Sequence, residues 1–201
     1  VVQSADGGDE LFAGYDKYRK IINRNNKSKM IPKILKKVVK EIKFRHGSMF
    51  EKKHFKKIYN YCKNENLLDW FLDDSTAHDN FELRNLLKYP KLSQTNFHLN
   101  TENKDDLNSM LYLDIKTFLV DGIMHKVDRA TMYSGLEARE PLLDYRLIEF
   151  ALKIPQSLKL KNGELKYLLK TLAHSKLPKN LLQRPKQGFN IPIVDFTLII
   201  F

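Results

Sequence analysis

Apolar residues recur every three or four positions along most of the chain, and this spacing favours packed amphipathic helices. The pattern predicts helices over 9–24, 31–44, 49–62, 67–72, 107–118, 146–152 and 164–174. No internal repeat or low-complexity tract is found. With 201 residues, 42% of them hydrophobic, the chain can bury one sizeable core, or one core and a small subdomain. We therefore expect a mostly α-helical fold.

The first residues depart from this helical pattern. Val1–Gln3 predict the end of a buried strand, which the glycine-rich segment Ser4–Glu10 joins to the first helix. Such a turn presents backbone N–H groups and a positive helix end, which suit an anion such as phosphate. The carboxylates of Asp6, Asp9 and Glu10 would repel a bare phosphate, so they indicate Mg²⁺ between protein and phosphate. The same acids also suit an ordinary capped helix, because they complement the helix dipole.

The composition indicates whether the chain could span a membrane and which redox compartment it suits. The longest purely apolar run, 198–201, is far shorter than the roughly 20 residues that a membrane-spanning helix needs. The single cysteine, Cys62, excludes an internal disulfide framework. It also predicts a reducing compartment, and we expect the cytoplasm.

Lysines concentrate between Lys27 and Lys57 and contribute most of the net charge of +11. This excess is compatible with a polyanionic partner such as nucleic acid, an anionic membrane or a phosphorylated substrate. Apolar residues between Ile31 and Ile42 recur at helical spacing, so the lysines are expected on the solvent face of an amphipathic helix. Arginine, which reads bases and phosphates in a bidentate manner, is scarce here, and nucleic-acid binding is the weaker alternative.

An acidic residue lies on the apolar stripe of the predicted helix 107–118. Asp114 shares that stripe, and a buried acid needs a partner. Acidic and basic residues crowd the positions from Asp121 to Arg146, so we expect the partner there, in ion pairs buried between helices. The residues assigned to such pairs are Asp128, Arg129, Glu137, Arg139 and Asp144, and Tyr15 is expected to be a packed aromatic side chain.

Three ordered blocks of sequence carry a resemblance to a known family. They are SADGGDELFAGY at 4–15, DGIMHKVDRATMYSGLEAREPLLD at 121–144 and LPKNLLQRPKQGFNIPI at 177–193. Together they resemble the synthetase domain of the glutamine-dependent asparagine synthetase family, whose frame the β-lactam synthetases share. The resemblance implies an ATP-pyrophosphatase fold, an α/β domain in which a parallel sheet carries the nucleotide. This chain would be its C-terminal helical portion, with a short parallel strand at residues 1–4.

The resemblance also implies what lies elsewhere in the protein. Residues 1–201 would be a partial synthetase domain. The Ser-Gly-Gly-x-Asp-Ser pyrophosphate loop is absent from the sequence and would lie upstream of Val1. An N-terminal glutaminase domain with a terminal cysteine nucleophile would also belong to the full protein. Cys62 is internal and is no substitute for that cysteine.

The implied reaction is an ATP-dependent ligation. A carboxylate, by default the side chain of aspartate, attacks the α-phosphorus of ATP to give an acyl-adenylate and Mg²⁺-bound pyrophosphate. Ammonia derived from glutamine then displaces AMP and forms the amide. The resemblance thus implies ATP and Mg²⁺ as cofactors and aspartate, or another small carboxylic acid, as substrate. A homodimer is a further expectation.

The family motifs place the functional residues by position. Ser4, Ala5 and Asp6 match the strand end that touches the nucleotide, and Asp6 would also orient the attacking nitrogen or accept its proton. Asp9 matches a Mg²⁺ ligand. Lys186, held in a loop that is stiffened by two prolines, would stabilise negative charge on the phosphates and the intermediate. Ala5 stands where the family usually has glycine. An acid at position 6 favours the asparagine branch, because the β-lactam branch has tyrosine there.

Other functions remain as alternatives. The chain could be an inactive or complementing fragment of this fold, or a lysine-rich helical module that binds nucleic acid. A zinc site is disfavoured, because none of the six histidines pairs with another histidine or with the cysteine at zinc-ligand spacing. A Cys62 nucleophile with His54 is weaker still.

Overall fold

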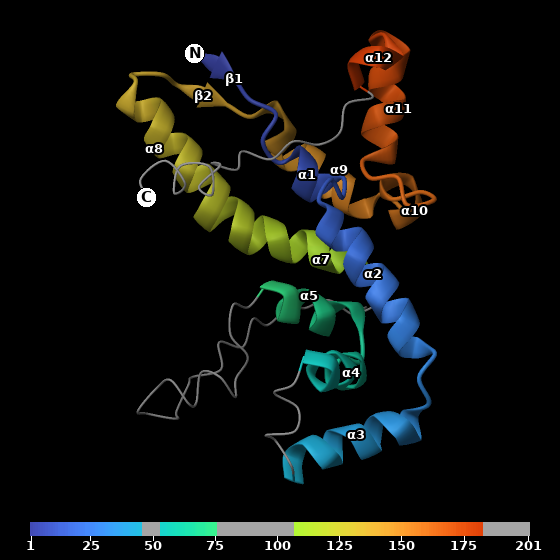
Figure 1. Ribbon diagram of the computed structural model, residues 1–201. Coiled ribbons are helices and arrows are strands. Elements are labelled where there is room, and N and C mark those ends of the chain that lie inside the picture. The colour runs from blue at the N-terminus through green and yellow to red at the C-terminus, as the bar shows by residue number, and fades with distance from the viewer. Residues whose placement is uncertain (46–52, 76–106, 183–201) are drawn as a thin grey trace, which may run out of the picture. The chain divides into compact units, whose positions relative to one another are not determined.

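The computed structural model describes residues 1–45, 53–75 and 107–182. The chain divides into two compact units, Val1–Tyr167 and Leu168–Phe201. Each unit is described by itself below. In both units the described residues are mainly helical, as the apolar spacing predicts (Figure 1).

The first unit contains two short strands and a series of helices. Its elements are β1 (Val2–Gln3), α1 (Gly8–Leu11), α2 (Asp16–Lys29), α3 (Lys33–Arg45), α4 (Lys53–Lys63), α5 (Leu67–Ser75), α7 (Leu107–Asp114), the π-helix η2 (Ile115–Met124), α8 (His125–Tyr133), β2 (Ala138–Arg139), the 3₁₀ helix η3 (Pro141–Leu143), α9 (Tyr145–Lys153) and α10 (Gln156–Lys159). The predicted helices at 31–44, 67–72 and 146–152 are confirmed as α3, α5 and α9.

The predicted helix over 9–24 is wrong in one respect, because the chain breaks between α1 and α2. Ala13 adopts a left-handed backbone conformation with φ of 55°. The N–H group of Gly14 donates a hydrogen bond of 2.8 Å to the carbonyl oxygen of Asp9 and so closes the end of α1. A new helix then begins at Asp16.

The two strands form a parallel pair in which Val2 lies opposite Ala138 (Figure 1). The N–H group of Val2 donates to the carbonyl oxygen of Glu137 at 2.8 Å, and that of Ser4 donates to the carbonyl oxygen of Arg139 at 3.0 Å. The expected short parallel strand at the start of the chain is therefore confirmed. Its expected burial is wrong: within the described residues β1 has β2 as its only strand neighbour, and Val1 is 83% exposed.

The hydrophobic core of the first unit lies among α2, α5 and α7. Its buried members are Ala13, Tyr18, Ile21, Leu67, Leu68, Trp70, Phe71, Leu107, Met110, Leu111 and Leu113. The predicted apolar stripe is confirmed up to Ile115, but Phe118 is 47% exposed. The chain changes there from α-helix to the π-helix η2, which adds residues per turn and shifts later side chains away from the stripe.

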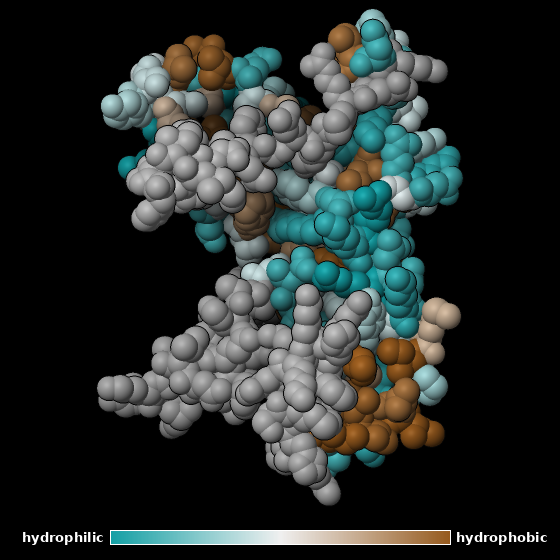
Figure 2. All heavy atoms as spheres, in the orientation of Figure 1, coloured by the Kyte–Doolittle hydropathy of each residue, from teal (hydrophilic) through white to brown (hydrophobic). Residues whose placement is uncertain are grey.

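Helix α3 packs against α4, yet part of its apolar side stays uncovered. Ile34 is 81% exposed, and Leu35 and Val38 are also exposed, so Figure 2 shows hydrophobic surface over α3. Lys33 and Lys37 are exposed as predicted for the solvent face. The apolar spacing of this segment therefore predicts the helix correctly and overstates its burial.

The partners of Asp114 differ from those predicted. Its buried carboxylate lies 2.6 Å from the Nζ atom of Lys17 and accepts a hydrogen bond from the hydroxyl of Tyr18. Helix α2 therefore provides the partners, and they lie far away in sequence. The residues that were predicted to form buried ion pairs lie at or near the surface instead: Asp128, Arg129, Glu137 and Arg139 are exposed and Asp144 is half-buried.

The single cysteine lies on α4, as the amphipathic spacing predicts. Cys62 is 1% exposed, and desolvation by burial raises the pKa of its thiol. Among the described parts of the chain, no helix has both the length and the apolar character needed to cross a bilayer.

The described part of the second unit contains two helices, α11 (Tyr167–Lys176) and α12 (Lys179–Leu182). The first residue of α11, Tyr167, is the last residue of the first unit. The hydroxyl of Ser175 donates to the carbonyl oxygen of Leu172 at 2.7 Å. Pro178 lies between the two helices, and the N–H group of Leu181 donates to its carbonyl oxygen at 3.1 Å. The predicted helix at 164–174 is therefore confirmed with a start that is shifted by three residues.

Candidate functional site

The turn that follows β1 brings two predicted nucleotide-binding residues together. The hydroxyl of Ser4 donates a hydrogen bond to the carboxylate of Asp6, and the N–H group of Asp6 donates to Ser4 Oγ at 3.2 Å. Ala5 lies between them and is exposed. The Ser4 hydroxyl therefore fixes the orientation of the Asp6 carboxylate at the end of the strand.

The two glycines of the turn allow close packing. Gly7 has a φ of 87°, and a Cβ atom added to it would lie 2.1 Å from Leu143 Cδ2. A Cβ atom on Gly8 would lie 3.1 Å from Leu142 Cδ1. The N–H group of Gly8 donates to the carbonyl oxygen of Ala5 at 3.3 Å. These glycines thus lie against η3 and the turn itself, with Lys166 Nζ also 3.9 Å from a Cβ atom added at Gly8, and the predicted binding of an anion by their backbone stays a prediction.

Asp9 forms an ion pair that no motif in the sequence predicts. Its Oδ1 atom lies 2.9 Å from the Nζ atom of Lys166, and the two side chains are 25% and 32% exposed, respectively. Gly14 lies directly beside the pair. A Cβ atom on Gly14 would come within 1.8 Å of Asp9 Oδ1 and 2.2 Å of Lys166 Cε. The absence of a side chain at position 14 is therefore a condition for this ion pair.

A tight turn just before Lys166 places this residue beside Asp9. Lys161 and Glu164 exchange two backbone hydrogen bonds of 3.2 and 2.8 Å around Asn162 and Gly163, which have φ of 51° and 80°. Two consecutive residues with positive φ are typical of a type I′ turn, for which Asn-Gly is a favoured sequence. The dipeptide at 162–163 was thus a usable signal. Arg19 Nη1 donates to the carbonyl oxygen of Gly163 at 3.4 Å and ties the turn to α2.

Glu10 differs from Asp6 and Asp9 because its side chain points into the protein interior. It is buried, and its Oε1 atom accepts a hydrogen bond of 2.5 Å from the hydroxyl of Tyr15. Desolvation raises the pKa of Glu10, and the hydrogen bond from Tyr15 partly opposes that rise. The Tyr15 ring packs 6.0 Å from the ring of Tyr18, which confirms the packed aromatic predicted there. The prediction that Glu10 faces a metal ion together with Asp6 and Asp9 is therefore wrong, because its side chain is buried and bonded to Tyr15.

Behind the turn, Lys17 lies among aromatic rings. Its Nζ atom is 5.0 to 5.4 Å from the ring centres of Tyr15, Tyr18, Phe71 and Phe118. The same atom is paired with Asp114 on α7. Cation–π contacts and an ion pair thus fix α2, the helix that follows the turn, against α7.

Lys186, the predicted partner of these acids, lies outside the described residues. Within the described ranges, no three His, Cys, Asp or Glu side chains gather closely enough to hold a metal ion by themselves. Mg²⁺, however, is commonly held by one or two carboxylates together with phosphate oxygens. The Asp9 carboxylate is partly exposed, so dissolved ions can reach it, but the Lys166 ammonium already lies beside it as a counter-charge.

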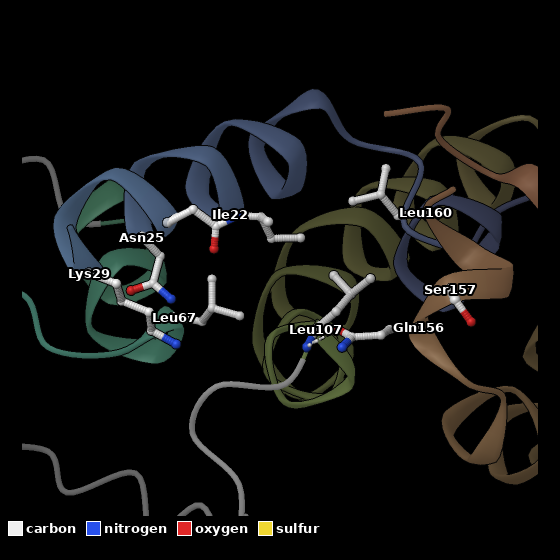
Figure 3. A pocket seen from close by; sticks show the side chains of 9 residues that line it. Ile22, Asn25, Lys29, Leu67, Leu107, Gln156, Ser157 and Leu160 are labelled. Carbon is white, nitrogen blue, oxygen red and sulfur yellow. Dashed lines mark hydrogen bonds between the residues drawn. The ribbon is translucent and has the colours of Figure 1, made fainter. Parts of the chain in front are cut away.

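A separate pocket of about 400 Å³ lies in the first unit (Figure 3). Asn25, Lys29 and Leu67 line one end, and Gln156, Ser157 and Leu160 line the other. The side chain of Gln156 accepts a hydrogen bond of 3.4 Å from the N–H group of Leu107. Ser4, Ala5, Asp6 and Asp9, the predicted site residues that the structure describes, do not line this pocket, so it is distinct from the turn at Ser4–Asp9.

Comparison with known proteins decides the family. The family model described as asparagine synthase matches residues 1–198. The chain belongs to the asparagine synthase family. The resemblance that was inferred from the three sequence blocks is thereby confirmed. No solved structure matches the chain significantly.

Several curated relatives extend the likeness to the asparagine synthase family along most of the chain. Asparagine synthetase (glutamine-hydrolyzing) 1 of Bacillus subtilis (strain 168) is 34% identical over 96% of this chain and 31% of its own length. A putative asparagine synthetase (glutamine-hydrolyzing) of Mycobacterium bovis is 27% identical over 96% of this chain and 30% of its length. The asparagine synthetase (glutamine-hydrolyzing) of Homo sapiens is 43% identical over 68 residues, 32% of this chain and 12% of its length. The chain thus spans about a third of the first two relatives.

Proposed function

We propose that this chain is part of an ATP-dependent, amide-forming ligase of the asparagine synthetase type. The observation that carries the proposal is the family match over residues 1–198, together with a relative that is named as a glutamine-hydrolyzing asparagine synthetase and is 34% identical. The proposed reaction activates a carboxylate, by default that of aspartate, as an acyl-adenylate with release of pyrophosphate. Ammonia from glutamine then forms the amide and releases AMP.

The proposed roles follow the turn after β1. Ser4, Ala5 and Asp6 contact the nucleotide. The hydrogen bond from Ser4 supports a role of the Asp6 carboxylate in orienting the attacking nitrogen or accepting its proton, because it fixes one carboxylate oxygen. Asp9 would hold Mg²⁺, which when bound would neutralise charge on the phosphates. Lys186 would add positive charge near the same phosphates.

The remaining parts of the proposed enzyme belong to the rest of the protein. We propose that residues 1–201 form a partial synthetase domain, since the Bacillus subtilis and Mycobacterium bovis relatives are about three times as long as the matched part. A pyrophosphate-binding loop and a glutaminase domain would be supplied elsewhere in the full chain. The protein would act in the cytoplasm, where ATP and aspartate are available.

Aspartate-dependent exchange of pyrophosphate into ATP tests this proposal in the complete protein. We expect exchange that requires both aspartate and Mg²⁺. Asp9→Asn should abolish it, because the amide removes the charge that holds the metal. The control is Asp74→Asn, which alters a partly exposed acid paired with Arg24 and should leave exchange unchanged. Full exchange in Asp9→Asn would remove Asp9 from the metal, and no exchange with any small carboxylic acid would contradict the proposed reaction.

A second measurement concerns the 201-residue chain by itself. We expect it to support little exchange, because its sequence contains no Ser-Gly-Gly-x-Asp-Ser loop to hold the pyrophosphate. A circular dichroism spectrum with helical content would show that a negative result does not come from unfolding. Robust exchange by this chain would refute the expectation that it is an incomplete synthetase.

A further inference from the structure

The ion pair between Asp9 and Lys166 occupies the carboxylate to which the proposed function assigns a metal. The ammonium lies 2.9 Å from Asp9 Oδ1, at hydrogen-bonding distance. Both side chains remain partly exposed, so solvent and dissolved ions have access to the pair. The carboxylate therefore already has a counter-charge before any divalent ion arrives.

Several independent features of the backbone hold this pair in place. Gly14 leaves room that a single methyl group would fill, because its Cβ atom would overlap both partners. Lys166 has a φ of 54°, a left-handed conformation that is unfavourable for a residue with a side chain. The preceding turn is anchored to α2 through Arg19 and Gly163. A contact that depends on a glycine and on a strained lysine is more constrained than an ordinary surface ion pair.

We propose that Lys166 competes with a divalent cation for the Asp9 carboxylate. This inference rests on the proposed function, in which Asp9 binds Mg²⁺. An ammonium and a metal ion on the same carboxylate repel each other, so one must be displaced when the other binds. Lys166 therefore lowers the affinity of Asp9 for a metal ion that arrives alone. A metal ion that arrives with a nucleotide brings phosphate oxygens as further ligands and can displace the ammonium. Lys166 is thus a positioning residue that couples metal binding to nucleotide binding.

A second ion pair of the same unit provides a matched comparison. Lys63 and Asp73 form a contact with similar exposure, 23% for each side chain. Neither residue belongs to the turn after β1 or to the segment that carries Lys166. Removing the Lys63 charge perturbs a similar pair without touching Asp9. It therefore separates a local effect on Asp9 from a general effect of losing one lysine.

The experiment measures binding of Mn²⁺ to the complete protein without nucleotide, by the electron paramagnetic resonance signal of free Mn²⁺. Lys166→Met keeps the aliphatic stem and removes the charge, and we expect it to bind Mn²⁺ about two- to fivefold more tightly, the factor that corresponds to a partly exposed ion pair. Lys166→Arg keeps the charge and should match the wild type, as should Lys63→Met. Lys166→Gln serves as a second neutral variant if Lys166→Met does not fold. Equal or weaker Mn²⁺ binding by the neutral variants overturns the proposal.

The double variant Asp9→Asn/Lys166→Met separates this inference from the proposed function. We expect Asp9→Asn to remove the gain in affinity that Lys166→Met produces. If Asp9→Asn weakens Mn²⁺ binding while Lys166→Met fails to strengthen it, the competition is wrong and the metal role of Asp9 stands. If Asp9→Asn has no effect in either background, Asp9 does not bind the metal, and both proposals fail at that residue. Loss of pyrophosphate exchange alone affects only the proposed reaction.

Discussion

The hydroxyl of Tyr18 donates a hydrogen bond to the carboxylate of Asp114, although 96 positions separate the two residues in sequence. The Nζ atom of Lys17 lies 2.6 Å from the same carboxylate. Two neighbouring residues of α2 thus share one buried acid of α7. This connection fixes the helix that follows the Ser4–Asp9 turn, so the position of the candidate site depends on a contact remote from it.

Removing the shared acid should destabilise the first unit. Asp114→Ala leaves the Lys17 ammonium without this carboxylate and takes a hydrogen-bond acceptor from Tyr18, and we expect a loss of about 3 kcal/mol in the free energy of unfolding. Urea denaturation of the chain, followed by circular dichroism, measures it. Glu65→Gln, which alters the exposed pair with Lys40, should have no measurable effect. A loss below about 1 kcal/mol for Asp114→Ala would show that the buried network contributes little.

A methyl group at position 14 should disrupt the Asp9–Lys166 pair. The Cβ atom of Gly14→Ala would overlap Asp9 Oδ1 and Lys166 Cε, and because these atoms end flexible side chains that can move aside, we expect the pair to be lost at a cost of up to about 1 kcal/mol. The control is Gly122→Ala in η2, where the nearest atom would be 3.5 Å away. Helix propensity predicts that this control is neutral or more stable by up to about 1 kcal/mol. Equal thermal stability of the two variants would contradict the crowding at position 14.

Replacing Ala13 by glycine should stabilise the chain. Ala13 has a φ of 55°, and relief of that conformation is worth about 1 to 2 kcal/mol, against roughly 0.8 kcal/mol for the lost methyl group. We therefore expect a net gain of up to about 1 kcal/mol in denaturant unfolding. Ala151→Gly is the matched control, since Ala151 is equally buried but lies inside α9. It should lose stability, and a loss in both variants would refute the strain at Ala13.

Asp144 should make stability depend on pH in the acid range. Its side chain accepts a hydrogen bond from the N–H group of Arg146 at the start of α9 and pairs with the Arg146 guanidinium. These contacts lower the pKa of Asp144 from 3.8 to about 2. The folded chain therefore binds this proton more weakly than the unfolded chain does. The stabilisation is fully present above about pH 4 and is lost as the pH falls through about 2.

The variant Asp144→Asn isolates this effect, because asparagine can still cap the helix but carries no charge. The difference in unfolding free energy between wild type and variant should be positive at pH 5 and should vanish near pH 2. Urea titrations at a series of pH values measure it. A difference that does not change with pH would show that the Asp144 charge is immaterial to folding.

Much of the fold is predictable from local spacing alone. The helices α3, α5 and α9 follow from apolar residues at intervals of three and four, and the strand at Val2–Gln3 follows from the short apolar run ahead of the glycine-rich segment. The break at Ala13 was missed because alanine gives no local signal for a left-handed conformation. The exposure of Phe118 was missed because the change to a π-helix is not encoded in the apolar period.

The candidate site shows the same division between local and distant information. The Ser4–Asp6 contact spans two residues and lies within the motif itself. Lys166 and the partners of Asp114 come from distant segments, and spacing along the chain cannot indicate which distant lysine reaches which acid. The prediction that Asp114 pairs within the next charged segment failed for this reason, since it assumed that the nearest charges in sequence would also be nearest in space.

The buried thiol on α4 has a practical consequence for measuring motion. Cys62 is the only sulfhydryl in the sequence, and its side chain is 1% exposed. Alkylating reagents can reach it only when α4 detaches or the unit unfolds, and while the thiol stays buried its raised pKa also disfavours the reactive thiolate. The rate of alkylation of the unmodified chain therefore reports how often the structure around α4 opens. No engineered label is needed for that purpose.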